Sequence, residues 1–158
     1  MGSISAGLLM TKLVNNQRYY LLVHPGGPFF RNKDLGSWSI PKGLAEAAED
    51  MLETAIREYQ EETGIIPQAP YHPLGQIKQK GGKIVHAWAF ELPVEQVNWD
   101  PKDLVSNTFK LEWPPRSGKF QIFPEIDQAG WFDFDLAVRK INAAQVPFLE
   151  KANALSHS

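Results

Sequence analysis

The sequence contains no cysteine among its 158 residues. This absence excludes disulfides, thiolate zinc sites and cysteine nucleophiles, and it fits a reducing cytoplasm. No apolar run approaches the roughly 20 residues that a membrane-spanning helix needs, and no signal-peptide pattern opens the chain. The net charge of −2 argues against binding of nucleic acid through bulk electrostatics. We therefore expect a cytoplasmic protein, without a membrane anchor, whose phosphate-binding ability comes from a local arrangement.

Length and composition fit one folded domain over residues 1–158. Hydrophobic residues make up 43% of the chain and charged residues 22%, which is ordinary for a globular protein with a sizeable core. There is no internal repeat, linker or low-complexity segment. Strand-like and helix-like segments alternate along the chain, which predicts a mixed α/β domain.

The apolar patterns predict the following elements in order. The first half has strands over Ile4–Met10 and Arg18–His24 with a turn at Asn15–Asn16, a Gly- and Pro-rich loop over Pro25–Trp38, a short strand over Ser39–Gly43, and a helix over Glu49–Thr63. The second half has a hairpin of Leu74–Gln79 and Lys83–Leu92, a loop-rich region over Pro93–Pro124, a last strand over Ala129–Phe134, and one or two helices broken near Pro147.

The predicted helix crowds acidic residues into the segment REYQEETG, Arg57–Gly64. Glu58, Glu61 and Glu62 are three and four residues apart, so they share one helix face beside the apolar stripe. Like charges at this spacing destabilise a helix by roughly 0.2–0.5 kcal/mol per pair. A divalent cation such as Mg²⁺ or Mn²⁺ relieves the repulsion, because it prefers hard oxygen ligands. The alternative is an ordinary solvated acidic face.

The 23 residues from Gly43 to Ile65 resemble the signature of the Nudix hydrolases. Every fixed position of that signature is present: Gly43, Glu49, Arg57, Glu58, Glu61, Glu62 and Gly64. One variable position departs, since Tyr59 stands where an aliphatic residue is usual. The resemblance implies an α/β/α sandwich with a mixed sheet. It also implies metal-dependent hydrolysis of a nucleoside diphosphate linked to another group, by attack of water at phosphorus.

The same resemblance implies a role for each charged residue of the signature. Glu58, Glu61 and Glu62 correspond to metal ligands. Glu49 corresponds to a supporting carboxylate, and Arg57 to its ion-pair partner, which orients the catalytic loop and helix. Which glutamate is the general base varies within the family, and Glu58 is our first choice.

Residues outside the signature extend the predicted site. Family members often add a metal ligand from a later loop, and here Glu125 has similar spacing before Trp131, with Glu112 as its rival. Lys42, in IPKG, resembles the lysine of PPKG in diadenosine tetraphosphate hydrolases, so we expect it and Gly43 to contact substrate phosphate. Ala87 stands where that subgroup tends to have a base-stacking tyrosine.

The segment EWPPRSGK, Glu112–Lys119, has no counterpart in the signature. Trp113 offers a stacking surface, and Arg116 and Lys119 place two cations three residues apart. We expect a flap that holds the distal phosphates or base of a long substrate. The alternative is a solvated loop with Trp113 at the edge of the core.

Other aromatic and histidine residues carry weaker signals. Phe29, Phe30 and Trp38 either stack a base or seal the edge of the core. His24 and His86 have no metal-ligand pattern around them and are interpreted as ordinary strand histidines.

These observations favour a Mg²⁺- or Mn²⁺-dependent pyrophosphohydrolase of nucleoside polyphosphates, with a diadenosine tetraphosphate-like substrate preferred. Cleavage of nucleoside triphosphates, including damaged ones, and removal of a 5′ diphosphate from RNA are alternatives. An alternative of another class is a module that binds a nucleotide without turnover.

Overall fold

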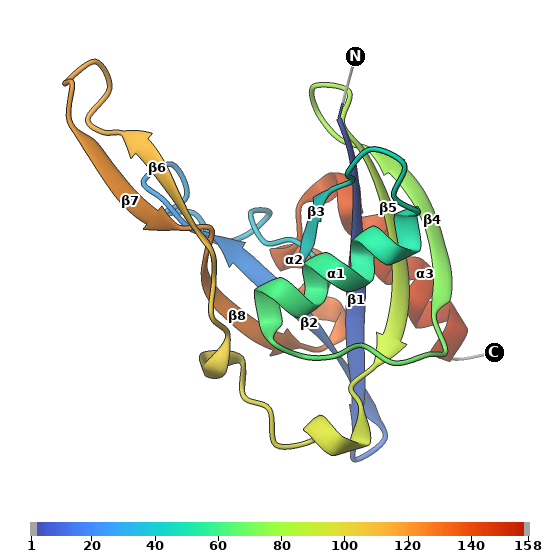
Figure 1. The fold of residues 1–158 in the computed structure, drawn as a ribbon. Coiled ribbons are helices and arrows are strands. Elements are labelled where there is room, and N and C mark those ends of the chain that lie inside the picture. Colours follow the sequence, from blue (N-terminus) through green and yellow to red (C-terminus); the bar gives the residue numbers. More distant parts are fainter. Residues whose placement is uncertain (1–2, 157–158) are drawn as a thin grey trace.

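A mixed six-stranded sheet forms the centre of the computed structural model, which describes residues 3–156 (Figure 1). Five strands follow the order β4-β5-β1-β2-β8, and β3 pairs with β1 off this path. Their bounds are β1 Ile4–Val14, β2 Gln17–Pro25, β3 Lys42–Leu44, β4 His72–Lys78, β5 Ile84–Glu91 and β8 Ile126–Phe132. The β1–β5 pair is parallel, and the other pairs of this sheet are antiparallel.

Helices cover both faces of the sheet. Helix α1 (Met51–Thr63) lies on one face, and α2 (Phe134–Lys140) and α3 (Val146–Ser156) lie on the other (Figure 1). Successive side chains of a strand point to opposite faces, so β1 contributes Leu8 to the α1 core and Leu9 to the α2–α3 core. The predicted α/β/α sandwich with a mixed sheet is confirmed.

Helix α1 begins two residues later than predicted. The side chain of Asp50 accepts a hydrogen bond from the backbone N–H of Glu53 and so caps the helix, which leaves Glu49 outside it. The helix ends at Gly64, whose left-handed conformation (φ 77°) suits glycine. Tyr59, the residue that departs from the signature, is fully buried and packs edge-on against Phe90.

The prediction of a loop-rich region over 93–124 was wrong in its second half. Strands β6 (Thr108–Glu112) and β7 (Phe120–Pro124) form a separate two-stranded hairpin that projects from the body (Figure 1). Two 3₁₀ turns, Val94–Gln96 and Pro101–Asp103, precede it. The strands escaped prediction because the Pro- and Gly-rich turn between them dominates the local composition.

Three further boundaries differ from the predictions. Strand β8 begins at Ile126, earlier than predicted, and it ends at Phe132 because the side chain of Asp133 caps α2. The break between the last helices falls after Lys140, not near Pro147. Pro147 lies in the first turn of α3, where the missing N–H of proline has no helical partner to lose. Within residues 3–156, no helix is long and apolar enough to cross a membrane.

Strand β3 is displaced from the predicted Ser39–Gly43. Ser39 forms only an isolated bridge with Val23, and the strand proper begins at Lys42. Gly7 on β1 permits the close approach of this segment, since a Cβ on Gly7 would lie 2.8 Å from the Cβ of Lys42. The sheet therefore holds β3 against β1, next to α1.

Candidate active site

Strand β3 and helix α1 meet at Gly43 and Glu58. A Cβ on Gly43 would overlap the carboxylate of Glu58. The position requires glycine for space, because Gly43 is not among the residues with positive φ. The glycine of the predicted signature thus makes room for one of its glutamates.

Arg57 joins the loop before α1 to the helix. Its Nε and Nη2 donate to the two carboxylate oxygens of Glu49 at 2.8 and 3.0 Å, and Thr54 Oγ1 donates to Glu49 at 2.7 Å. The guanidinium, followed by the Thr54 hydroxyl, lowers the pKa of Glu49 to about 2. Arg57 also donates to the backbone carbonyl of Leu44. The structure therefore brings Glu49 and Arg57 together as the predicted ion pair.

The same guanidinium faces the acidic side of α1. Arg57 Nη1 lies 3.0 Å from a carboxylate oxygen of Glu58 and 3.5 Å from one of Glu61. Glu58 is half-buried, and this burial raises its pKa despite the contact with Arg57. Glu61 is more exposed.

Glu62 is the most enclosed carboxylate of the cluster. The residue is 6% exposed, and no donor in residues 3–156 hydrogen-bonds to its side chain. Burial, followed by the charges of Glu58 and Glu125, raises the pKa of Glu62 to about 8. The nearby ammonium of Lys42 acts in the opposite direction. A buried carboxylate among other carboxylates is costly without a cation.

The structure separates the two rivals for the additional ligand. Glu125 lies between β7 and β8, close enough for its charge to raise the pKa of both Glu58 and Glu62. Glu112 is at the other end of the hairpin, where its carboxylate accepts from the backbone N–H groups of Arg116 and Gly118 at 3.3 and 3.1 Å. Only Glu125 is beside the acidic cluster.

The donor set suits a hard divalent cation, although its present conformation does not enclose one. Across residues 3–156, no three carboxylate or imidazole side chains converge closely enough to hold a metal ion. Arg57 contacts both Glu58 and Glu61 in this conformation. Glu58, Glu61, Glu62 and Glu125 all offer oxygen, and within residues 3–156 the Glu62 carboxylate accepts no hydrogen bond. The chemistry of these carboxylate oxygens therefore suits a hard divalent cation.

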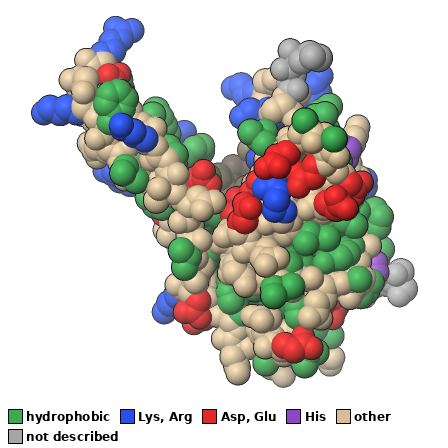
Figure 2. All heavy atoms as spheres, viewed as in Figure 1, with side chains coloured by type: hydrophobic (Ala, Val, Ile, Leu, Met, Phe, Trp, Pro, Cys, Tyr) green, Lys and Arg blue, Asp and Glu red, His purple; other side chains and the backbone are tan. Residues whose placement is uncertain are grey.

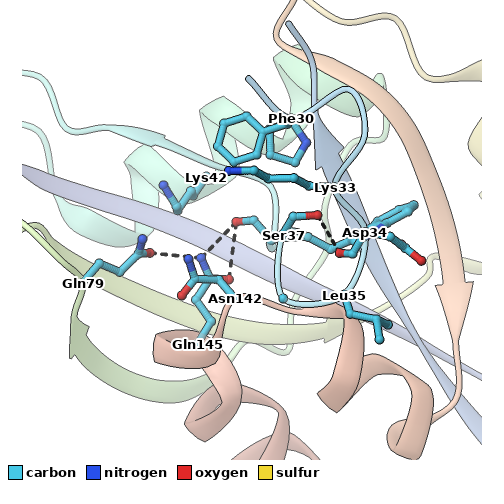
Figure 3. A pocket seen from close by; sticks show the side chains of 13 residues that line it. Phe30, Lys33, Asp34, Leu35, Ser37, Lys42, Gln79, Asn142 and Gln145 are labelled. Atoms are coloured by element: carbon cyan, nitrogen blue, oxygen red, sulfur yellow. Dashed lines mark hydrogen bonds between the residues drawn. The ribbon is translucent and has the colours of Figure 1, made fainter. Parts of the chain in front are cut away.

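A hollow of about 450 Å³ lies beside Lys42 (Figure 3). Lys33, Phe30 and Gln79 line it together with Lys42. Burial and the charge of Lys83 lower the pKa of Lys42. The hollow thus combines cations, an amide and an aromatic ring next to the acidic cluster.

A buried glutamine fixes the floor of this hollow. Gln145 accepts from the backbone N–H of Ile40 and donates to Ser39 and Gln79, each at 3.0 Å. Sequence reasoning missed Lys33, Gln79 and Gln145, because the hollow is assembled from segments far apart in the chain. No local motif marks these residues.

The remaining aromatic and histidine residues are placed as follows. Trp38 is buried and donates its indole N–H to Asp34, so it packs in the core with one edge at the hollow beside Lys42. His24 is buried and bonds the side chain of Asp127 and the carbonyl of Lys33, both at 2.7 Å. These contacts agree with the interpretation of His24 as a structural strand residue.

The predicted flap residues are not beside the acidic cluster. Trp113, Arg116 and Lys119 lie in the turn of the β6–β7 hairpin. Trp113 is half-buried and packs edge-on against Phe29, with ring centroids 5.3 Å apart. Arg116 and Lys119 are exposed. Since β7 has five residues and Glu125 follows its last one, the turn lies about 17 Å from Glu125 at ~3.4 Å per residue.

Known proteins resemble the chain in sequence and structure. A model of the NUDIX domain matches residues 7–152. A crystal structure of a C. elegans Ap4A hydrolase binary complex is 25% identical, with a TM-score of 0.65 over 97% of this chain and 96% of that chain. The NUDIX domain of Shewanella oneidensis NrtR complexed with ADP ribose shares the fold at 15% identity, with a TM-score of 0.63 over 98% of this chain and 88% of that chain.

A shorter match exists to the Nucleoside diphosphate-linked moiety X motif 6 protein of Mus musculus. The two are 42% identical over 50 residues, which is 32% of this chain and 15% of the mouse protein. The chain therefore matches only a small part of that relative's length.

Proposed function

This chain belongs to the Nudix family and is a hydrolase of pyrophosphate bonds, and from that premise we propose that it cleaves nucleoside polyphosphates with the help of Mg²⁺ or Mn²⁺. The preferred substrate is a dinucleoside polyphosphate of the diadenosine tetraphosphate type. One observation carries the proposal: Glu62 is buried without a hydrogen-bond donor, within reach of the charges of Glu58 and Glu125. Such an arrangement is stabilised by a cation that also binds a diphosphate.

Glu58, Glu61, Glu62 and Glu125 would hold the cation. When bound, it supplies neutralisation of phosphate oxygens and a water of lowered pKa. Glu58 is our choice for the base, and its free carboxylate oxygen would accept the proton of the attacking water. A half-buried carboxylate with a raised pKa is a better proton acceptor than an exposed one.

The ion pair of Arg57 and Glu49 positions these groups. It ties the segment between β3 and α1 to the helix. The backbone at Gly43 is thereby held in a fixed position against the carboxylate of Glu58. Geometry held this way contributes to the rate, because the reacting groups need no further ordering.

The hollow beside Lys42 is the natural place for the nucleotide. Lys42 and Lys33 supply positive charge for phosphate, Gln79 supplies an amide, and the half-buried ring of Phe30 supplies a stacking surface. Ala87 is buried in the α2–α3 core, so no side chain at that position holds the base. The likeness to the C. elegans Ap4A hydrolase supports a dinucleoside substrate.

A substrate screen tests the proposal. Purified protein with Mg²⁺ is assayed against dinucleoside polyphosphates, nucleoside triphosphates, nucleotide sugars and 5′-triphosphorylated RNA, with products separated by chromatography. We expect the highest kcat/KM for a dinucleoside polyphosphate, and a value lower by a factor of about 100 or more in the Glu62→Gln variant. A higher kcat/KM for triphosphates or RNA would overturn the proposed substrate class, while the proposed hydrolysis of a pyrophosphate bond would stand. Binding without turnover for every substrate would overturn the proposed enzymatic activity and favour a module that binds a nucleotide.

A further inference from the structure

The β6–β7 hairpin projects from the body of the molecule and contacts it through the loop after β2, where Phe29 packs against Trp113 (Figure 1). Within residues 3–156, its strands pair only with each other. Near its base, Glu125 donates its backbone N–H to Asn107, and Gly26 donates to Glu125, at 2.8 and 2.9 Å. An isolated two-stranded hairpin is marginally stable in water, so a partner surface would stabilise this one.

One face of the hairpin exposes apolar side chains. Phe120 and Ile122 occupy alternate positions of β7, so they point to the same face, and they are 59% and 71% exposed. Lys110 lies opposite Ile122 in the register, and its ammonium is 5.1 Å from the centre of the Phe120 ring. Adjacent exposed apolar residues on a projecting element are typical of a protein interface.

The turn of the hairpin carries two cationic side chains, Arg116 and Lys119, against the single carboxylate of Glu112. Arg116 and Lys119 are exposed, and neither forms an ion pair with any residue in 3–156. Glu53 and Glu61 are exposed on α1, where Arg57 is the only basic residue of the helix. Figure 2 shows acidic side chains gathered over α1 and Lys or Arg side chains at the far end of the hairpin. The two surfaces are complementary in charge.

The two surfaces of one molecule cannot meet in this conformation. The turn lies about 17 Å from Glu125, the acidic residue at the base of the hairpin, because each hairpin strand extends ~3.4 Å per residue. A second copy of the chain presents the same acidic surface without that restriction. A two-fold dimer satisfies both copies at once, because each offers one hairpin and one acidic site.

We propose that the β6–β7 hairpin is an arm through which two copies of this chain form a dimer. The face with Phe120 and Ile122 packs against the second copy. Arg116 and Lys119 of each copy then lie at the acidic site of the other and contact the polyphosphate of its substrate. The dimer itself does not depend on the proposed hydrolysis, whereas the contact with substrate rests on it.

A second copy explains these residues better than a polynucleotide does. The chain has a net charge of −2, and the carboxylates of α1 would repel a strand that follows the hairpin toward the site. Exposed Ile122 gains little from a nucleic acid, since it has no ring on which a base can stack.

Sedimentation velocity tests the dimer without any substrate. We expect the wild-type protein to sediment as a dimer over a wide concentration range, and the double variant Phe120→Ser, Ile122→Ser to sediment as a monomer. Val94→Ser is the matched control, because Val94 is exposed in the 3₁₀ turn outside the hairpin. If the wild-type protein sediments as a monomer at all concentrations, the proposal that the hairpin is a dimerisation arm is overturned. A wild-type monomer that binds labelled single-stranded RNA through Arg116 and Lys119 would assign the hairpin to nucleic acid instead.

Mixing two inactive variants tests the contact with substrate. Glu62→Gln keeps the arm and loses the acidic site, whereas Arg116→Ala with Lys119→Ala keeps the acidic site and the dimer face and loses the two cations of the arm. After subunits exchange at random, half of the dimers are mixed and each has one complete site, so we expect about a quarter of the wild-type rate. A mixture no more active than its components would overturn the proposed contact between the arm of one copy and the substrate bound to the other. If the protein is a dimer but turns over no nucleotide, the proposed function fails and the dimer stands.

Discussion

The carboxylate of Glu58 occupies the space that a side chain on Gly43 would fill. The glycine is on β3 and the glutamate on α1, so the contact joins two elements of the sandwich at the acidic site. Arg57 approaches the same carboxylate from the helix side, at 3.0 Å. Glu58 is therefore confined between a strand and a guanidinium, and small changes at Gly43 act directly on it.

Replacing Gly43 by alanine should lower kcat at least tenfold, which is about 1.4 kcal/mol in the barrier. The backbone tolerates alanine, but the new Cβ must displace Glu58 from its place. The assay is steady-state kinetics with circular dichroism to confirm the fold. Leu44→Ala, at an exposed neighbouring position, is the control and should retain activity. Wild-type turnover in Gly43→Ala would show that Glu58 does not act from this position.

The amide variants Glu58→Gln and Glu62→Gln should each lower kcat by a factor of about 100 or more, close to 3 kcal/mol. Glutamine keeps the size of the side chain and removes the charge that would bind the cation. Glu53→Gln is the matched control, since Glu53 is exposed in the first turn of the same helix. Normal rates and normal metal affinity in either variant would remove that glutamate from the site.

Mg²⁺ or Mn²⁺ should raise the Tm of the wild-type protein, because binding to the native state alone stabilises it by RT ln(1 + [L]/Kd). The shift should be much smaller in Glu62→Gln, which lacks the buried charge. Excess EDTA should remove both the shift and the activity. Full activity in EDTA would exclude a metal-dependent mechanism.

The metal-free protein should lose stability as the pH rises toward 8. The pKa of Glu62 is about 8 in the folded protein, against a usual 4.5, so folding favours the protonated carboxyl. The contribution of Glu62 to the free energy of unfolding is complete below pH 4.5 and is lost as the pH rises through about 8. Thermal melts in EDTA from about pH 6 to about pH 9, in wild type and Glu62→Gln, measure the effect on both sides of the Glu62 pKa of about 8.

The variant and the metal provide two checks on this trend. Glu62→Gln has no proton to lose at this position, so its Tm should vary less with pH. Added Mg²⁺ should flatten the wild-type profile, since the cation replaces the proton. A wild-type Tm that is constant over this range would show that Glu62 is already charged in the metal-free protein.

The sequence alone predicted the acidic helix and the shared face of its glutamates. The spacing of Glu58, Glu61 and Glu62 places them on one helix face through local geometry, and Asp50 and Gly64 mark the helix ends by capping. The Gly43–Ile65 signature led to the family, which the match over residues 7–152 confirms. The alternation of strand-like and helix-like segments predicted a mixed α/β domain, and the resemblance to the family implied the mixed sheet between helices.

Only the tertiary structure decided which distant residues meet. The choice of Glu125 over Glu112 depends on where β7 ends, and the hollow beside Lys42 depends on Gln79 and Gln145 coming together. The hairpin escaped prediction because its alternation is short and its turn is rich in Pro and Gly. Capping and helix periodicity are properties of neighbouring residues, whereas these contacts arise from the packing of the whole chain and have no signal in any single segment.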